Sequence, residues 1–327
     1  MLLPNVLVTF KADEKVRQPI LSALGSLGKV AFLSEIAPKD RALELAEADV
    51  LISWNLEREL QPSEFAMLSN VKLLQLLSAG ADHTPFARIP ETVTIAANAG
   101  AYAEQMAEHI LAMILAIYKN LIDRHNKLAE GVFDHTNENR LLAGSSCAIL
   151  GLGGIGKATA RLLRPFRVKI LAINTSGRTD EQVDFIGTMK DLEYVLRLAD
   201  VVLVTLPLTN STRGLIRNRE LDWMKNDATV VNVARGGLID ETALFQKLTH
   251  NPTFHAAIDT WWDEPFRDEK FHTNHPFLTL PNVLGSPHNS GLVPGALTRA
   301  AVDAAENIKR FLNHEQTLGV VKRSDYT

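Results

Sequence analysis

Short apolar runs rich in β-branched residues alternate with longer amphipathic stretches along the chain. In about the first 100 residues, five such runs start roughly twenty residues apart, the length of one strand plus one crossover helix. These runs are Val6–Phe10, Lys29–Leu33, Val50–Trp54, Leu73–Leu77 and Val93–Ala97. Continuous apolar strands joined by helices are typical of a parallel sheet covered on both faces. This part of the chain therefore predicts a small doubly wound α/β domain.

A second alternating series begins after a long helical segment. That helix is expected from about Ala101 to Glu130, with an apolar stripe that we interpret as core or subunit contact. Six further strands are expected at Cys147–Leu150, Lys169–Asn174, Val201–Leu206, Thr229–Val233, His255–Asp259 and Val283–Gly285. Six strands with helices between them describe a complete dinucleotide-binding sheet. A last helix is expected to open near Pro294, since proline suits the first turn of a helix.

The two series predict two domains, with linkers at Ala97–Ala101 and Asn289–Pro294. Residues 1–99 together with 290–327 would form a discontinuous substrate domain, and residues 100–289 a dinucleotide-binding domain. The length of 327 residues suits two domains of ~100–200 residues each.

Composition narrows the class of protein. Apolar residues make up 46% of the chain and charged residues 22%, which are values of a globular rather than a disordered protein. The net charge of −4 argues against a nucleic-acid surface, because such binding needs a clustered basic face. The single Cys147 cannot form an intrachain disulfide, and neither a secretory leader nor a bilayer-spanning stretch of ~20 apolar residues is expected. These features predict a cytoplasmic protein with no membrane or nucleic-acid partner.

A glycine-rich loop follows the first strand of the second series. It reads Gly151-Leu152-Gly153-Gly154-Ile155-Gly156 and opens a helix expected at Lys157–Leu163. The first glycine permits the tight turn, the second lets a pyrophosphate approach the backbone, and the third lets helix and strand pack closely. The N-terminus of the helix presents unpaired N–H groups to phosphate. Because the loop lies between a strand and a helix, it predicts a dinucleotide site.

The strand after this loop bears on the choice of cofactor. Such strands usually end in an acid that holds the adenosine 2′-hydroxyl. Here the strand ends in Asn174-Thr175-Ser176-Gly177-Arg178, so no carboxylate in this stretch repels a 2′-phosphate. Thr175 and Ser176 could donate to that phosphate, and Arg178 could pair with it. NADP is favoured, and a polar turn that accepts NAD through Asn174 is the alternative.

Three polar segments follow the ends of the last predicted strands, at Asn232–Gly237, Asp259–Pro265 and Ser286–Gly291. In doubly wound folds ligands bind beyond the carboxyl ends of the strands, so these segments are expected to converge on one site.

Hydride transfer to a carbonyl requires a cation that holds and polarises the substrate, and an acid that protonates the oxygen. Arg235 offers paired N–H donors that match a carboxylate. His288 is the natural acid, because imidazole titrates near neutral pH. A nearby carboxylate such as Glu264 would orient the ring of that histidine.

The order of these motifs resembles the D-isomer-specific 2-hydroxyacid dehydrogenase family, over about Leu73 to Leu312. Besides the glycine loop and the three late segments, the resemblance rests on Ser78-Ala79-Gly80-Ala81-Asp82, Asn98-Ala99-Gly100, Ala107-Glu108-His109 and Leu206-Pro207-Leu208-Thr209 with Thr212. It implies a flavodoxin-like substrate domain and a Rossmann dinucleotide-binding domain with a cleft between them. It also implies a homodimer built on the helix of Glu108 and His109, so His109 is interpreted as structural.

The resemblance implies a role for each site residue. Arg235 would bind the carboxylate and carbonyl of a 2-oxoacid, His288 would be the general acid/base, and Glu264 would be its partner. The loop of Ser78, Ala79 and Gly80 would hold the substrate carboxylate. Asp259 would contact the nicotinamide amide. The remaining cofactor contacts would come from Gly151, Gly153, Gly154, Ile155, Gly156, Leu206, Pro207, Thr212, Val233 and Ala234.

The predicted activity is reduction of a short 2-oxoacid, such as glyoxylate, hydroxypyruvate or pyruvate, to a D-2-hydroxyacid with NAD(P)H. One alternative is a formate-dehydrogenase-like enzyme, although that pattern carries glutamine where Glu264 stands. The other is a nucleotide-sensing, corepressor-like binding protein. Trp261 and Trp262 replace a smaller pair of the family pattern, and they either shape the pocket or pack in the core. No metal site is expected, since His272 and His275 lie in a predicted loop.

Overall fold

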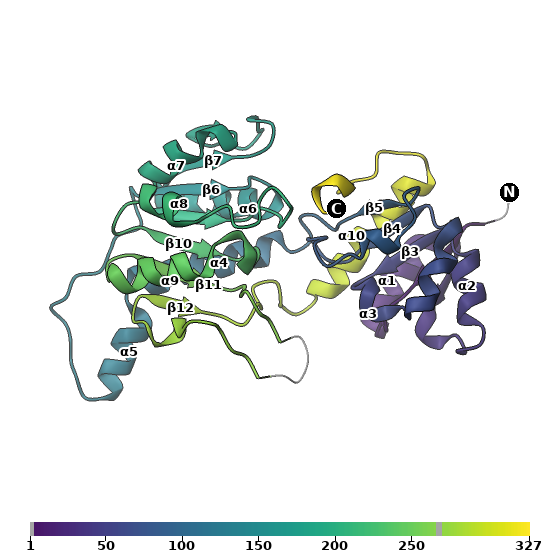
Figure 1. The fold of residues 1–327 in the computed structure, drawn as a ribbon, viewed down its shortest axis with the longest axis horizontal. Coiled ribbons are helices and arrows are strands. Elements are labelled where there is room, and N and C mark those ends of the chain that lie inside the picture. The colour runs from purple at the N-terminus through teal and green to yellow at the C-terminus, as the bar shows by residue number, and fades with distance from the viewer. Residues whose placement is uncertain (1–2, 266–269) are drawn as a thin grey trace. The chain divides into compact units, whose positions relative to one another are not determined.

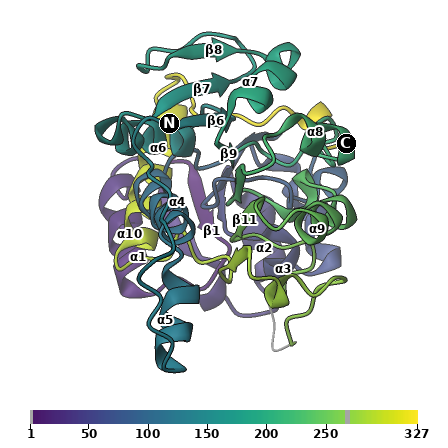
Figure 2. The ribbon, with the colours of Figure 1, turned by 90° about the vertical axis from the view of Figure 1, so that its left-hand side faces the viewer.

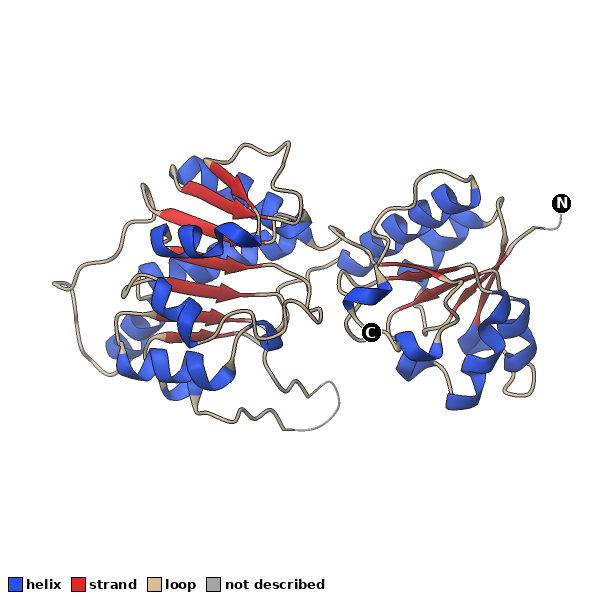
Figure 3. Ribbon diagram, turned by 45° about the horizontal axis from the view of Figure 1, so that its top comes forward, coloured by secondary structure: helices blue, strands red, loops and turns tan. Residues whose placement is uncertain are grey.

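The computed structural model describes residues 3–265 and 270–327. The chain divides into two compact units: one extends up to Tyr102 and resumes at Val293, and the other covers Ala103–Leu292. In each unit, helices cover both faces of a parallel sheet (Figure 1, Figure 3). The prediction of two doubly wound parallel-sheet domains is therefore confirmed.

The smaller unit is built on five parallel strands in the order β2-β1-β3-β4-β5. The strands are β1 Asn5–Val8, β2 Lys29–Phe32, β3 Val50–Ser53, β4 Leu73–Leu76 and β5 Thr94–Ala96. The helices are α1 Glu14–Leu24, α2 Arg41–Glu47, α3 Leu56–Glu59 and α10 Ala296–Leu312. This is the flavodoxin-like strand order, in which ligands bind beyond the carboxyl ends of the strands.

Helix α10 brings the end of the chain back to the smaller unit. Its buried face carries several alanines and Ile308, and these pack against α1 and the strands. Alanine lets the helix approach the sheet closely, and the side-chain amide of Asn307 donates to Gln75 Oε1 on β4 at 2.7 Å. The discontinuous unit is thus joined through its core.

The larger unit is built on seven parallel strands in the order β12-β11-β10-β9-β6-β7-β8. The strands are β6 Ser146–Leu150, β7 Lys169–Ile173, β8 Phe185–Gly187, β9 Val201–Val204, β10 Thr229–Asn232, β11 His255–Ile258 and β12 Val283–Gly285. The helices are α4 Ala103–Tyr118, α5 Leu121–Ala129, α6 Gly154–Leu163, α7 Leu192–Leu198, α8 Asn218–Trp223 and α9 Glu241–His250. The first six strands follow the Rossmann order, and β12 adds a seventh beside β11.

Successive residues of each strand face opposite layers, as the geometry of a strand requires. On β6, Ile149 packs with residues of α4 and α6, whereas Leu150 packs with residues of α7, α8 and α9. Both faces are therefore buried, which explains why these strands are apolar along their whole length. Short 3-10 helices lie at Leu33–Glu35, Pro62–Asn70, Phe86–Arg88, Arg164–Phe166, Met189–Asp191, Gly236–Leu238, Phe277–Thr279 and Arg323–Asp325.

In the larger unit one predicted element was wrong and one strand was missed. The helix expected from Ala101 to Glu130 is two helices, because Asn120 adopts a left-handed conformation with φ of +51° between α4 and α5. Asparagine is one of the few residues that tolerate this conformation. The sheet also has a strand that was not predicted, β8, which pairs with β7. A strand of three residues is too short for hydrophobic periodicity to reveal.

Helix α5 projects away from the sheet of its own unit (Figure 2). None of its residues is buried. Exposed apolar side chains continue along this helix and the segment after it: Leu121, Ile122, Leu128, Val132, Phe133 and Leu141. In the part of the chain that the structure describes, no helix has both the length and the apolar character needed to cross a bilayer.

Candidate active site

The glycine loop joins β6 to α6. Gly151 has φ of +103°, and a Cβ added there would lie 2.9 Å from the backbone of Thr205. A Cβ on Gly156 would lie 2.5 Å from the carbonyl oxygen of Gly151, whereas one on Gly153 would meet no atom within 4 Å. The loop therefore combines a tight turn, a close contact of helix with strand, and an open face at the N-terminus of α6. These are the features of a phosphate-binding cradle.

The turn after β7 is organised by the side chain of Asn174. Its Oδ1 accepts hydrogen bonds from the backbone N–H of Ser176 at 3.1 Å and of Gly177 at 2.7 Å. Its Nδ2 donates to the carbonyl oxygen of Arg178 at 2.8 Å. The side chains of Thr175, Ser176 and Arg178 are exposed on this fixed turn. Asn174 thus builds the turn, and the hydroxyl of Ser176 donates within it, to the carbonyl oxygen of Arg178 at 3.2 Å. Thr175 and Arg178 are the exposed donors beside it.

Two acids follow this turn, and both are paired with bases of α6 or its C-terminal end. Asp180 forms an ion pair with Lys157. Glu181 lies 2.9 Å from Arg161 Nε and 3.0 Å from Arg164 Nη2. Although partial burial opposes the shift, these two arginines hold the pKa of Glu181 below its usual value. Neither carboxylate therefore adds an uncompensated negative charge near Arg178.

Five further predicted cofactor residues follow β9 and β10, the strands next to β6 on one side of the sheet. Thr212 Oγ1 donates to the carbonyl oxygen of Pro207 at 2.6 Å and so closes the loop after β9. Leu206 and Ala234 are half-buried, and Val233 is buried. Because the strands are parallel, these residues lie at the same edge of the sheet as the glycine loop.

Arg235 occupies a short turn directly after β10. The side chain of Asn232 accepts from the backbone N–H of Ala234 at 3.1 Å and donates to the carbonyl oxygen of Arg235 at 2.9 Å. Arg235 itself is half-buried. A Cβ on the next residue, Gly236, would lie only 2.4 Å from the carbonyl group of Trp261. The backbone of the arginine loop therefore lies directly against the loop that follows β11.

His288 and Glu264 are brought together by the loops that follow β12 and β11. Nδ1 of His288 lies 2.9 Å from Oε2 of Glu264, and the two side chains are 29% and 14% exposed. The other carboxylate oxygen accepts the backbone N–H of Trp261 at 2.8 Å. Glu264 is thus fixed on both oxygens, and the carboxylate fixes the orientation of the imidazole ring.

His288 has φ of +50°, a left-handed conformation that is uncommon for a residue other than glycine. Its backbone N–H donates to the carbonyl oxygen of Asp259 at 2.8 Å. The fully buried carboxylate of Asp259 accepts the backbone N–H groups of Asn289 at 3.1 Å and Ser290 at 3.2 Å. These bonds hold the loop around His288. The predicted contact of Asp259 with the nicotinamide stays a prediction.

The two tryptophans pack in the core. The indole N–H of Trp261 donates to the carbonyl oxygen of Ser286 at 2.9 Å, and that of Trp262 to Ile239 at 2.7 Å. Trp261 makes an edge contact with Phe277, on which Trp262 stacks with a centroid distance of 5.1 Å. Of the two readings left open by the sequence, the structure favours packing: the indoles tie together the loops that carry Arg235, Glu264 and His288.

In the smaller unit, the predicted Ser78–Gly80 segment follows β4, and Ser78 Oγ donates to the carbonyl oxygen of Gly80 at 2.8 Å. His83 was not predicted as a site residue, and its Nε2 lies 3.0 Å from the carbonyl oxygen of Trp54 and 3.4 Å from Ser78 Oγ. This histidine links the loops that follow β3 and β4. A loop has no periodic pattern of apolar residues, so the only sequence feature that could have indicated His83 was its position five residues after Ser78.

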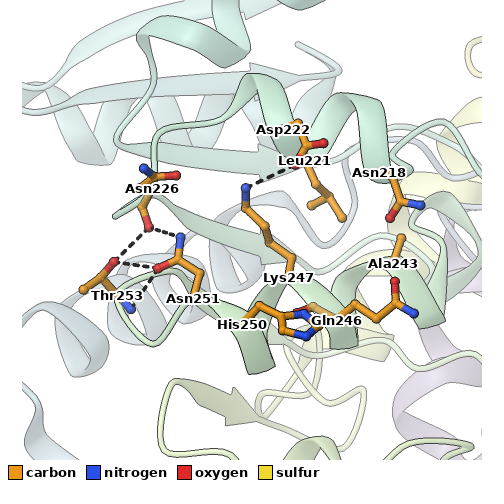
Figure 4. Close-up of a pocket in the computed structure, with 10 residues that line it drawn as sticks. All are labelled: Asn218, Leu221, Asp222, Asn226, Ala243, Gln246, Lys247, His250, Asn251 and Thr253. Atoms are coloured by element: carbon orange, nitrogen blue, oxygen red, sulfur yellow. Dashed lines mark hydrogen bonds and ion pairs between the residues drawn. The ribbon is translucent and has the colours of Figure 1, made fainter.

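A groove between α8 and α9 is distinct from this site (Figure 4). Asn226, Asn251 and Thr253 line one end of it and hydrogen-bond to one another just before β10 and β11, at the amino edge of the sheet. Lys247 reaches Asp222 at 3.5 Å within the groove. In residues 3–265 and 270–327, no group of three or more His, Cys, Asp or Glu side chains is arranged to hold a metal ion.

The larger unit matches a known family of proteins. Residues 111–290 match the family model described as D-isomer specific 2-hydroxyacid dehydrogenase, NAD binding domain. Among curated proteins, the chain is 31% identical over 265 residues to a glyoxylate reductase from Thermofilum pendens, covering 78% of this chain and 76% of that protein. It is 27% identical over 319 residues to D-3-phosphoglycerate dehydrogenase from Methanocaldococcus jannaschii, covering 96% of this chain but only 59% of that longer protein.

Among solved structures, a protein from Pyrobaculum aerophilum described as a candidate formate dehydrogenase is similar over 100% of both chains, with a TM-score of 0.83 and 27% identity. The similarity to this solved structure extends over both units of the chain. The protein therefore belongs to the D-isomer-specific 2-hydroxyacid dehydrogenase family, and it is an oxidoreductase with an NAD(P)-binding domain.

Proposed function

We propose that this protein reduces a short 2-oxoacid to a D-2-hydroxyacid, with His288 as general acid, Glu264 as its partner and Arg235 as the substrate-binding cation. The observation that carries the proposal is the 2.9 Å pair of His288 Nδ1 with Glu264 Oε2. The pair is partly buried and lies at the carboxyl edge of the sheet, where ligands bind in doubly wound folds. The similarity to a glyoxylate reductase supports the same substrate class.

The residues divide the reaction between them. The two parallel N–H donors of Arg235 suit a carboxylate and its neighbouring carbonyl oxygen, which the positive charge polarises. Glu264 accepts from Nδ1 of His288 and so leaves Nε2 as the nitrogen that gives its proton to the developing alkoxide. Bound NAD(P)H supplies the hydride that the carbonyl carbon receives. In the reverse direction His288 takes the proton back.

The cofactor fits the residues present. The open position at Gly153 and the N-terminus of α6 suit a pyrophosphate. We infer a preference for NADPH, because the turn of Thr175, Ser176 and Arg178 carries no acid that would select NADH, and the exposed side chains of Thr175 and Arg178 are donors. The pairing of Asp180 and Glu181 with bases supports this preference. The other proposed contacts with the cofactor are Gly151, Gly154, Ile155, Gly156, Asn174, Leu206, Pro207, Thr212, Val233, Ala234 and Asp259.

The test is turnover of NADPH and of NADH, followed at the absorbance of the reduced nicotinamide, with 2-oxoacids from glyoxylate and hydroxypyruvate to phenylpyruvate. His288→Gln is expected to lower kcat by roughly a hundredfold or more, the range of general acid catalysis, while cofactor binding persists. Glu264→Gln keeps a hydrogen-bond acceptor but not the charge, and it is expected to lose less. Near-normal turnover by His288→Gln would refute the assignment.

Two other functions are separated by the same assay. Formate oxidation transfers a hydride without a proton, so oxidation of formate with NAD+ or NADP+ and no loss in His288→Gln would favour the formate reaction. The structural similarity to a candidate formate dehydrogenase makes this arm necessary. A protein that binds cofactor but turns over neither substrate class would instead be a nucleotide-sensing, corepressor-like protein.

The proposal extends to the rest of the chain. The smaller unit, with Ser78, Ala79 and Gly80, would hold the substrate carboxylate. The exposed apolar surface of α5 and the segment after it suits a second copy of this chain, and Phe133, 77% exposed, is its most exposed large apolar side chain. Phe133→Asp is expected to shift the mass measured by light scattering from dimer to monomer.

The buried lone cysteine suits a reducing compartment such as the cytoplasm.

A further inference from the structure

A chain of three side chains connects helix α4 to the loop of His288. Nε2 of His109 lies 3.1 Å from Oγ of Ser286. Oγ of Ser286 in turn donates to Oδ1 of Asp259 at 2.6 Å. His109 belongs to α4, Asp259 follows β11, and Ser286 follows β12. The chain therefore joins a covering helix to two of the loops that form the candidate active site.

The chemistry of these groups fixes the direction of the hydrogen bonds. The buried carboxylate of Asp259 only accepts, so the hydroxyl of Ser286 must donate its single proton to it. The lone pairs of the same hydroxyl then remain to accept, and the donor within reach is the Nε2–H of His109. That proton is present both in the imidazolium and in one neutral tautomer. His109 thus holds the serine rotor in the orientation that Asp259 requires.

Asp259 is the group that depends on this arrangement. It is 0% exposed, and a buried carboxylate is costly unless hydrogen bonds or charge compensate it. Its oxygens accept from Ser286 and from the backbone N–H groups of Asn289 and Ser290. In the described part of the chain, His109 is the one basic side chain within 4 Å of its oxygens, at 3.8 Å from Oδ1.

The same carboxylate stabilises the strained backbone at His288. The left-handed φ of +50° at this residue costs free energy and persists only where the surroundings impose it. The backbone bonds from residues 289 and 290 to the Asp259 carboxylate supply that constraint directly after His288. Any weakening of the hydrogen bonds to the Asp259 carboxylate therefore changes the position of the His288 imidazole.

We propose that His109 is a positioning residue for His288, acting through the hydroxyl of Ser286 and the carboxylate of Asp259. The inference rests on the proposed role of His288 in proton transfer. It replaces the view of His109 as a purely structural residue of α4. In this role His109 touches neither substrate nor cofactor.

The test compares two substitutions at one position. Gln places an amide N–H at about the distance of the imidazole Nε2–H from the backbone, so His109→Gln keeps the donor, whereas His109→Leu removes it. With NADPH and the best 2-oxoacid, His109→Leu is expected to lower kcat by about tenfold, a typical effect of losing one hydrogen bond that bears on a charged group. The KM for NADPH should change less than twofold, and His109→Gln should recover most of the kcat.

A second readout does not depend on turnover. The backbone amides of His288, Asn289 and Ser290 should exchange with deuterium faster in His109→Leu than in the wild type, and at the wild-type rate in His109→Gln. His250→Leu is the matched control, because among the residues that the structure describes the ring of His250 bonds only to a carbonyl oxygen of its own helix, that of Gln246 at 2.8 Å. It should leave both kcat and exchange unchanged.

The link through the serine is tested by non-additivity. In a Ser286→Ala background the connection is already broken, so adding His109→Leu should cause little further loss of kcat. Full additivity, or equal losses in His109→Leu and His109→Gln, would overturn the inference. If instead His288→Gln retains its turnover while the exchange pattern is as expected, the proposed function has failed and the positioning of the loop has not.

Discussion

The contact between Gly236 and Trp261 gives the sharpest test of how the active-site loops are held. A Cβ at Gly236 would lie 2.4 Å from the carbonyl carbon and oxygen of Trp261 and 2.6 Å from the backbone nitrogen of Trp262. All three atoms are backbone, so no side-chain rotation can relieve the overlap. Gly236→Ala must therefore separate the loop of Arg235 from the loop that carries Glu264.

The size of that separation follows from the distances. Ordinary van der Waals contact of a Cβ begins near 3.4 Å, so a contact at 2.4 Å requires a shift of 3.4 − 2.4, or about 1.0 Å. A displacement of about 1 Å between reacting groups costs roughly a hundredfold in rate. Overpacking a tight site also costs roughly 1–3 kcal/mol of stability. We expect kcat/KM of Gly236→Ala to fall by about a hundredfold, with a modest loss of stability.

The neighbouring glycine provides the control. A Cβ at Gly237 would meet its nearest atom, Cδ2 of Leu208, at 3.4 Å, which is an ordinary contact with a flexible side chain. Gly237→Ala should therefore keep kcat/KM within about threefold of the wild type. The assays are steady-state turnover of NADPH with a 2-oxoacid and the free energy of unfolding in urea. Equal activity in the two alanine variants would refute the argument that this backbone contact positions Arg235.

Three further predictions concern cofactor choice and buried groups. Arg178→Ala should raise the KM for NADPH by roughly 10–100-fold, the effect of losing a hydrogen bond to a charged group, and the KM for NADH by less than twofold. Arg197→Ala is the surface control. Equal changes for both cofactors would mean that the turn does not select NADPH and serves NAD binding. Burial lowers the pKa of His255, so the unfolded chain binds a proton at this residue more readily than the folded chain does. The contribution of His255 to stability is therefore present above the ordinary pKa of ~6.5 and is lost as pH falls below it. Between pH 7.5 and 5.5, the free energy of unfolding in urea should fall less in His255→Gln than in the wild type. Burial raises the pKa of Cys147 to about 12, so a thiol reagent at pH 8 should react with it only after unfolding, and rapid reaction of the native protein would contradict the packing of β6.

The sequence determined the parts of this protein whose physics is local. Apolar runs such as Val201–Val204 are buried on both faces, so their composition alone marks a central parallel strand. The glycine loop is equally local, because one turn, one close contact and one open position lie within the six residues Gly151–Gly156. Where the local signal was too short or was interrupted, prediction failed, as at β8 and at Asn120.

Tertiary structure alone decided how the distant groups meet. Glu264 and His288 lie 24 residues apart, and only the adjacent order of β11 and β12 brings them to 2.9 Å. The periodicity of the sequence does not reveal that the carboxylate of Asp259 is fully buried under the loop of His288. Nor does it reveal that His109, on a helix that packs on the sheet, hydrogen-bonds to Ser286, 177 residues later in the chain. Side-chain direction and burial depend on strand order and helix packing. The chemistry of each residue type can therefore be read from the sequence, whereas the alignment of a proton-transfer site depends on the fold.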